Sequence, residues 1–274
     1  MATIAIDAMG GDNAPVEIVH GGIDAAVDRH EVVFVGDEAR LAPILAEAGS
    51  DIPIVHASEA IGMSDDPAIA IREKRDASIS VAMRLVKNGD ADAVLSAGST
   101  GAALTSAVFT LGRLKGVSRP AIASYFPSGS VVLDMGANLT CRPQDLARFA
   151  VMGAALARTR YGLERATVGL LNIGSEPSKG RVLEREAHRL IGSVPGIDFI
   201  GNIEGTDLAR AEANVIVCDG YTGNIMLKTA EGTARLVFNL ILEAVAAPEY
   251  ADAVETLAPA MMQLRERLNP ERAG

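Results

Sequence analysis

Short apolar segments alternate with amphipathic segments along most of this chain, and this alternation limits the folds available to it. The apolar segments are 3–6, 32–35, 53–56, 93–96, 122–126, 131–134, 168–172, 198–201 and 215–218. They are apolar along their length rather than at every second position, which is typical of parallel strands covered on both faces. Helical spacing is found in the segments 16–29, 78–89, 143–162 and 181–192. The sequence therefore predicts an α/β fold with a mostly parallel sheet.

Length and charge narrow the classes of protein further. The 274 residues suffice for one α/β domain spanning 1–274 or for two lobes that divide between Lys115 and Gly129. A net charge of −10 argues against binding of nucleic acid. No apolar window approaches the roughly 18 residues of a membrane span, and no signal peptide is recognisable. We expect a soluble, cytoplasmic protein.

Cysteine and histidine offer no metal site. Cys141 and Cys218 stand far apart, so we expect both to be reduced and buried. The four histidines have no metal-ligand spacing. We expect neither a metal nor a cofactor.

Glycine-rich loops follow five of the expected strands. They read DAMGGDNAP (7–15), SAGSTGAA (96–103), DMGANLT (134–140), NIGSEPSKG (172–180) and CDGYTGN (218–224). Ligands of open α/β sheets bind at the carboxyl ends of the strands, and the helix starts found there attract phosphate. If one sheet carries all five loops, they surround a common anion site. The alternative is that Gly, Ser and Asn only form turns and caps. No GxxxxGK[ST], GxGxxG or GxSxG motif is present.

Seven segments, taken in order, resemble one family. They are IAIDAMGGDNAP, MSDDPAIAIREKRDASI, AVLSAGSTGAAL, VVLDMGAN, LLNIGSEPSKG, GNIEGTDL and VCDGYTGNIMLKTAEG, between about Thr3 and about Gly232. Together they resemble the bacterial phosphate acyltransferases of phospholipid synthesis. Two departures stand out: Ser99 replaces the family's usual Asn, and the sequence stops at RLNPERAG, where family members continue through a further strand and helix.

The resemblance implies an activity, a fold and partners. The reaction is transfer of a fatty acyl group from acyl-[acyl-carrier protein] to inorganic phosphate, which yields acyl phosphate. The fold is a three-layer α/β/α arrangement related to isocitrate and isopropylmalate dehydrogenases and to phosphotransacetylases. The protein would be a homodimer at the membrane periphery that passes acyl phosphate to a membrane glycerol-3-phosphate acyltransferase.

A phosphate oxygen must attack the thioester carbonyl, so the site needs donors for phosphate and for the developing oxyanion. The catalytic candidates are Lys179, Glu176, Asp219 and Asn172. The candidates for binding phosphate or substrate are Asp7, Gly10, Gly11, Asp12, Ser96, Gly98, Ser99, Thr100, Gly101, Asn138, Gly174, Ser175, Thr222, Gly223, Asn224 and Lys228. Lys179 and Glu176 could instead form a surface ion pair, and Asp12 could be a helix cap.

Two basic clusters could steer an acidic acyl carrier protein, or could simply be solvated surface. They are Arg113, Lys115 and Arg119, and Arg158, Arg160 and Arg165. Residues 233–268 predict a helical pair broken at Pro248. Its apolar stripes are Leu236, Val237, Leu240, Ile241, Ala244 and Val245, and then Val254, Leu257, Met261, Leu264 and Leu268. The stripes fit core or dimer packing or a membrane-surface role, although Glu249, Asp252 and Glu255 weaken attraction to anionic lipid.

Other functions remain open at this point. A phosphotransacetylase-like enzyme would use acyl-CoA instead of a carrier-bound acyl group. A dehydrogenase of the same fold would need metal-binding carboxylates with substrate-binding arginines. A truncated, non-catalytic protein that binds anions or assembles with a partner is the alternative of a different class.

Overall fold

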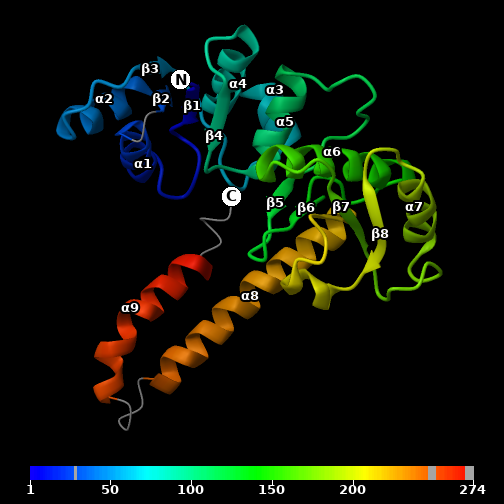
Figure 1. Ribbon diagram of the computed structural model, residues 1–274. Helices are drawn as coiled ribbons and strands as arrows, with labels where there is room; N and C mark the ends of the chain where they lie inside the picture. The colour runs from blue at the N-terminus through cyan, green and yellow to red at the C-terminus, as the bar shows by residue number, and fades with distance from the viewer. Residues whose placement is uncertain (28–29, 246–250, 269–274) are drawn as a thin grey trace. The chain divides into compact units, whose positions relative to one another are not determined.

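The strands of the protein form two separate sheets. The structure, a computed structural model, describes residues 1–27, 30–245 and 251–268. The chain divides into two compact units, Met1–Gly116 (unit 1) and Val117–Gly274 (unit 2), each with a sheet of its own (Figure 1). The strands lie within two residues of the nine apolar segments at each end, and the prediction of a mostly parallel α/β fold is confirmed. The expectation that one sheet carries all five loops is wrong.

Unit 1 is built on a four-stranded parallel sheet in the order β3-β2-β1-β4. Its strands are β1 (Thr3–Asp7), β2 (Glu31–Gly36), β3 (Ile54–His56) and β4 (Ala93–Ser96). Its helices are α1 (Val16–Val27), α2 (Glu38–Glu47), α3 (Pro67–Glu73), α4 (Ser78–Asn88) and α5 (Thr100–Thr110). Because both faces of this sheet are covered, its central strands are apolar on both sides.

Neighbouring residues of β1 show how the two faces are filled. Ala5 and Val35 pack with α4 on one face, whereas Ile6 and Phe34 pack with α1 and α2 on the other. Successive side chains of a strand point to opposite faces, so a short apolar strand contributes to two core clusters at once.

Unit 2 is built on a five-stranded sheet in the order β5-β6-β9-β7-β8. All its strand pairs are parallel except β5 with β6, which are antiparallel. Its strands are β5 (Ala123–Tyr125), β6 (Val131–Leu133), β7 (Thr167–Leu171), β8 (Asp198–Ile203) and β9 (Val215–Val217). Its helices are α6 (Pro143–Tyr161), α7 (Val182–Gly192), the 3-10 helix η1 (Gly205–Arg210), α8 (Gly220–Val245) and α9 (Ala251–Leu268).

The second sheet is the middle layer of three. Helices α6 and α7 bury Phe149 and Ile191 against one face. The opposite face packs against Leu208 of η1 and against Met226 and Leu227 in the second turn of α8. The loops that follow β6, β7 and β9 therefore leave a sheet that is covered by helices on both faces.

Helix α8 begins earlier than the sequence predicts. The helical pair was expected from residue 233, but α8 starts at Gly220 and runs without a break through Gly232. The early turns are held by tertiary packing, since Gly223 is buried and Met226 and Leu227 lie against the sheet. Packing of this kind readily outweighs the roughly 1 kcal/mol cost of a glycine inside a helix.

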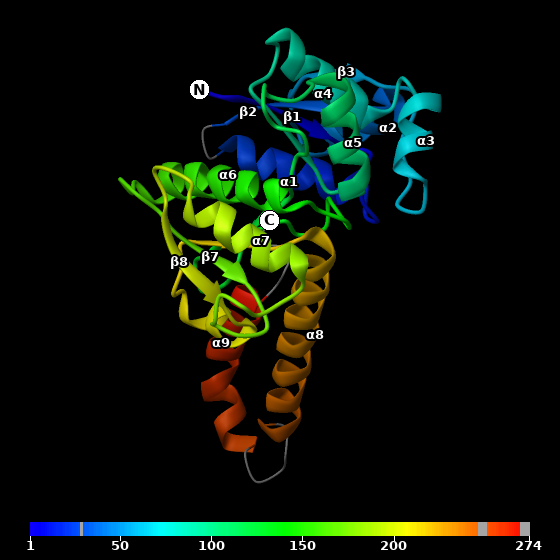
Figure 2. The same ribbon diagram turned by 90° about the vertical axis from the view of Figure 1, so that its right-hand side faces the viewer.

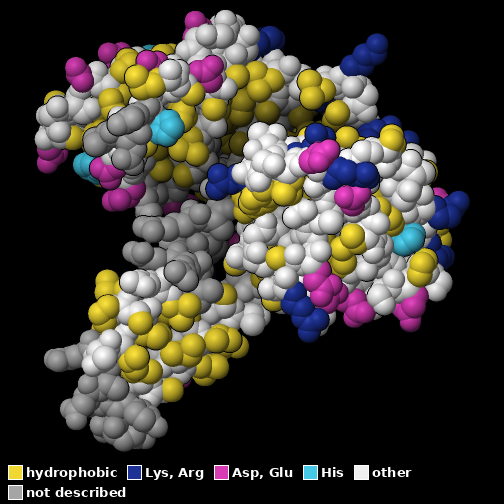
Figure 3. Space-filling model, viewed as in Figure 1, with side chains coloured by type: hydrophobic (Ala, Val, Ile, Leu, Met, Phe, Trp, Pro, Cys, Tyr) yellow, Lys and Arg dark blue, Asp and Glu magenta, His cyan; other side chains and the backbone are white. Residues whose placement is uncertain are grey.

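The apolar stripe of α8 is not part of the core of unit 2. Leu236, Val237 and Leu240 are 58%, 47% and 54% exposed. Helix α9 lies beside α8 and contacts it (Figures 1 and 2). Apolar side chains gather over this pair (Figure 3). Pro248 and Glu249, and the side chains of Val254, Asp252, Glu255 and Leu268, lie outside the described residues. Within the described segments, none of the helices has the length and hydropathy to span a bilayer.

Candidate functional site

The carboxyl ends of β1 and β4 bring two of the five loops together in unit 1. Asp7, at the end of β1, is buried and accepts hydrogen bonds from Ser96 Oγ at 2.7 Å and from Ser78 Oγ at 2.5 Å. A Cβ on Gly10 would lie 2.5 Å from Asp7 Oδ2 and 3.0 Å from the amide nitrogen of Gly98. Glycine is thus required at position 10 because the two loops approach so closely.

Several predicted anion donors of unit 1 are occupied within the protein. Ser96 Oγ donates to Asp7 and accepts from the amide of Gly98 at 3.1 Å. Ser99 Oγ accepts from the amide of Ala102 at 3.4 Å and caps α5. Thr100 and Gly101 form the first turn of α5. The cap explains why serine serves at position 99, since Ser and Asn are both favoured caps.

The remaining candidates of unit 1 lie at its surface. Gly11 backs onto Ala97, because a Cβ there would lie 2.9 Å from the Ala97 carbonyl oxygen. Asp12 is exposed and makes no hydrogen bond with the described residues. It does not cap α1, which begins four positions later at Val16.

The loop after β6 is organised around Asp134, which is fully buried. Its carboxylate accepts from the amides of Ile122, Ala137 and Asn138, and from Asn138 Nδ2 at 2.8 Å. Asn138 Nδ2 also donates to the carbonyl oxygen of Pro120 at 2.7 Å. Both hydrogens of the Asn138 amide are therefore occupied in this structure, and donating them to phosphate or substrate, as predicted, would require their release.

The loop after β7 carries the pair Lys179 and Glu176. Lys179 Nζ lies 3.9 Å from Glu176 Oε2, and the two side chains are 47% and 60% exposed. Asn172 joins the two ends of the loop, because its Nδ2 donates to the carbonyl oxygen of Lys179 at 3.2 Å. Asn202 Nδ2, on β8, donates to the carbonyl oxygen of Glu176 at 2.8 Å. The loop is held by amide side chains while its charged groups remain accessible.

Two further candidates of this loop differ in exposure. Gly174 is buried against the side chains of Glu176 and Lys179, since a Cβ there would lie 3.0 Å from each. Ser175 is exposed.

Asp219 joins the loop after β9 to the loop after β7. It is buried, and its Oδ1 accepts from the amide of Thr222 at 2.8 Å. Its Oδ2 accepts from Nη2 of Arg181, and Arg181 also donates to Glu184, with Nε 2.9 Å from Oε1. The hydrogen bonds to Glu184, and then that to Asp219, raise the pKa of Arg181 above its usual range despite partial burial. Arg181 is therefore a fixed positive charge between two carboxylates.

The first turns of α8 complete this end of the sheet. Gly223 lies so close to the loop after β6 that a Cβ would be 1.9 Å from the carbonyl oxygen of Asp134. Asn224 lies beside Gly136 and is exposed. Lys228 is 67% exposed and forms an ion pair with Glu231 at 2.9 Å, so it is engaged on the surface of α8.

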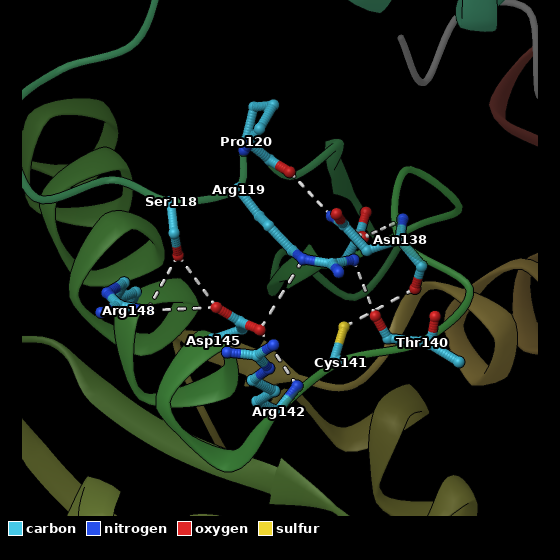
Figure 4. Close-up of polar contacts among 10 residues, drawn as sticks. Ser118, Arg119, Pro120, Asn138, Thr140, Cys141, Arg142, Asp145 and Arg148 are labelled. Atoms are coloured by element: carbon cyan, nitrogen blue, oxygen red, sulfur yellow. Dashed lines mark hydrogen bonds and ion pairs between the residues drawn. The ribbon is translucent and has the colours of Figure 1, made fainter.

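A network around Asp145 ties the loop after β6 to the start of α6 (Figure 4). Asp145 accepts from Ser118 at 3.0 Å and from Arg148 at 3.1 Å, and lies 3.9 Å from Arg119. Arg119 also donates to the carbonyl oxygen of Thr140 at 2.8 Å. Burial alone raises the pKa of Asp145, but the hydrogen bonds from Arg142 and Ser118 and the two arginine charges outweigh it and leave the pKa below its usual value.

Of the two basic clusters predicted to steer a carrier protein, the first is divided between the units, whereas Arg158, Arg160 and Arg165 all belong to unit 2. Arg113 and Lys115 belong to unit 1, whereas Arg119 belongs to unit 2 and serves the Asp145 network. Arg165 pairs with Asp198 at 2.6 Å. Arg160 stacks over Tyr125 at 5.7 Å.

Both cysteines are free thiols, and Cys218 is buried as expected, but Cys141 is only half-buried, so the expectation of burial is wrong for Cys141. Burial raises the pKa of Cys141 to about 11, and burial raises the pKa of Cys218 still further. Both are therefore protonated near neutral pH, and neither is set up as a nucleophile.

The five loops thus fall into two groups. Those after β1 and β4 meet in unit 1, and those after β6, β7 and β9 meet in unit 2. Sequence reasoning missed Asp134, Arg181, Asn202 and Ser78. Asp134 could have been found, because, like Asp7 and Asp219, it lies within two residues of the end of a strand. Arg181, Asn202 and Ser78 carry no such signal, since each has a partner far away in the sequence: Asp219, Glu176 and Asp7, respectively.

Comparison with known proteins agrees with this architecture. Residues 2–274 match the family model described as "Fatty acid synthesis protein". A phosphate acyltransferase of Desulforamulus reducens is 48% identical over 246 residues, which are 88% of this chain and 74% of that protein.

Solved structures resemble the chain in fold. A branched-chain phosphotransacylase from Enterococcus faecalis V583 has a TM-score of 0.55 at 19% identity, covering 84% of this chain and 83% of that one. A 4-hydroxythreonine-4-phosphate dehydrogenase from Klebsiella pneumoniae has a TM-score of 0.50 at 17% identity, covering 84% and 85%. The expected likeness to phosphotransacylases and dehydrogenases is confirmed at the level of the fold. The chain belongs to the phosphate acyltransferase family and is an acyltransferase.

Proposed function

We propose that this acyltransferase moves a fatty acyl group from acyl-[acyl-carrier protein] to inorganic phosphate and releases acyl phosphate. The observation that carries the proposal is the meeting of three strand-end loops in unit 2, where Arg181 bonds to Asp219 just before α8 and Lys179 precedes Arg181 by two residues. Two cations at the strand ends suit an inorganic anion. Membership of the family supports phosphate as the acceptor.

The chemistry requires no covalent intermediate. A phosphate oxygen attacks the thioester carbonyl carbon, a C–O bond forms, and the C–S bond breaks with the electron pair leaving on sulfur. Because a thiolate is a good leaving group, the protein has mainly to orient phosphate and stabilise the oxyanion. Lys179 would hold the phosphate, and Glu176 would position it or accept its proton.

The product would pass to a membrane glycerol-3-phosphate acyltransferase, and the protein would work as a homodimer at the membrane periphery. The exposed apolar stripe of α8 supports such contacts, because a contiguous apolar surface marks an interface with protein or membrane.

Release of carrier thiol tests the proposal directly. Purified protein is given acyl-[acyl-carrier protein] with and without inorganic phosphate, and free thiol is followed over time. Phosphate-dependent release is expected, with acyl phosphate trapped by hydroxylamine. A strong preference for acyl-CoA in competition would instead favour the phosphotransacetylase-like activity, and an inert, folded protein would favour a non-catalytic role.

A further inference from the structure

Three buried carboxylates crowd the end of the sheet in unit 2 where the phosphate would bind. Asp134, Asp219 and Glu184 are 0%, 4% and 7% exposed. Asp134 is served by backbone and side-chain amides. Asp219 and Glu184 share one cation, Arg181. An anion entering here therefore meets negative charge already in place, and Arg181 is the cation paired with it among the described residues.

Arg181 is placed to do more than pair with these carboxylates. Its Nε and Nη2 are used on Glu184 and Asp219, whereas its Nη1 makes no hydrogen bond with the described residues. Its side chain is 60% exposed although both partners are buried. A guanidinium has five donors in a rigid fork, so one edge can stay bound to carboxylates while the other binds a phosphate.

The backbone around Arg181 fixes this position. The Arg181 amide donates to Glu184 Oε2 at 2.7 Å, which closes the first turn of α7. Lys179 precedes it by two residues, in the loop held by Asn172 and Asn202. The two cations are thus carried by the same short, fastened segment.

We propose that Arg181 is a phosphate-binding residue: its charge offsets Asp219 and Glu184, and its Nη1 donates to the incoming phosphate. This inference rests on the proposed function, since it assigns a role within the same site. A phosphate-binding role can be distinguished from a purely structural ion pair, because a structural role predicts no selective change in the KM for phosphate when Arg181 is replaced.

The test compares Arg181→Gln, Arg181→Lys, Glu184→Gln and the double variant Arg181→Gln/Glu184→Gln. We expect Arg181→Gln to raise the KM for inorganic phosphate by about tenfold or more, with little change in the KM for the acyl donor. Arg181→Lys should raise it less, since it keeps the charge. The double variant has the same net charge at positions 181 and 184 as the wild type. Its KM for phosphate should therefore be lower than that of Arg181→Gln.

Several outcomes would overturn the inference. One is an unchanged phosphate KM in Arg181→Gln; another is a double variant worse than the single one, which would mark a structural role. Thermal unfolding of each variant identifies any loss of fold, and Arg181→Lys then carries the comparison.

Calorimetric titration with inorganic phosphate keeps this inference separate from the proposed function. If wild-type protein shows no phosphate-dependent thiol release, the proposed function fails, but weaker phosphate binding by Arg181→Gln would still support the role of Arg181. Equal phosphate binding by wild type and Arg181→Gln would refute it.

Discussion

At the scale of single residues, the charged groups of unit 2 differ sharply in what surrounds them. Asp145 is 5% exposed and has four hydrogen-bond or ion-pair partners, so its charge is essential to the local structure. Lys179 and Glu176 are half-exposed and barely within ion-pair distance. An exposed pair of this kind contributes at most about 1 kcal/mol to stability. Asp145 therefore contributes to folding, whereas Lys179 and Glu176 remain accessible for binding and catalysis.

Replacing Lys179 should therefore separate activity from stability. We expect Lys179→Ala to lower kcat/KM with phosphate by at least about tenfold, because a cation that stabilises the reacting anion is lost. The thermal midpoint should change little. Lys87→Ala, an exposed lysine in the last turn of α4, is the matched control. Unchanged phosphate kinetics in Lys179→Ala would remove this residue from the mechanism.

Replacing Asp145 by Asn should mainly lower stability, in contrast to Lys179→Ala, which should mainly lower activity. Loss of the charge leaves Arg119 and Arg148 without their buried partner, and we expect a loss of about 2 kcal/mol in the free energy of unfolding near neutral pH. The pKa of Asp145 is lowered in the folded protein, so its contribution is complete above the unfolded pKa of about 4.

The pH dependence checks that assignment. The stabilising contribution should vanish as pH falls through the lowered pKa of folded Asp145. Denaturant titrations of both proteins between pH 7 and about 3 measure this difference. A difference that stayed constant across that range would show that the charge of Asp145 is not responsible.

At the scale of elements, α8 combines two functions along one helix. In its first two turns Gly220 and Gly223 are buried and Met226 and Leu227 pack on the sheet, whereas later turns expose Leu236, Val237 and Leu240. Two glycines of α8 show the difference between its packed and its exposed turns. A Cβ on Gly223 would meet the backbone of Asp134, but a Cβ on Gly232 would have no atom within 4 Å among the described residues.

The same substitution at these two glycines should have opposite effects. Gly223→Ala would place Cβ 1.9 Å from the carbonyl oxygen of Asp134, and we expect a loss of about 3 kcal/mol or more as the loop after β6 is displaced. Gly232→Ala should add roughly 0.5–1 kcal/mol, because alanine is favoured within an exposed helix. Chemical denaturation measures both. Equal effects would mean that α8 does not pack on the loop as described.

At the scale of the whole molecule, each unit has a core of its own. The core clusters beneath β1–β4 draw only on unit 1, and those around β5–β9 draw only on unit 2. Compact units with separate cores commonly fold independently. The two groups of strand-end loops belong to different units because each group follows the strands of one sheet.

Residues 1–116, produced alone, should fold. We expect helical circular dichroism and a cooperative thermal transition, because the four strands and five helices of unit 1 cover one another. Loss of cooperativity would show that the core of unit 1 depends on the rest of the chain. The matched measurement is the unfolding of the intact protein.

The sequence by itself determined the strands, most helices and the strand-end loops, because burial on both faces leaves an apolar pattern that is local in the chain. It also determined the family, through seven ordered segments. Tertiary structure decided which strands share a sheet, where α8 begins and how Arg181 and Asn138 are used. Those features depend on hydrogen bonds and packing between residues far apart in sequence, such as Arg181 with Asp219 and Asp7 with Ser96, and no local pattern records them.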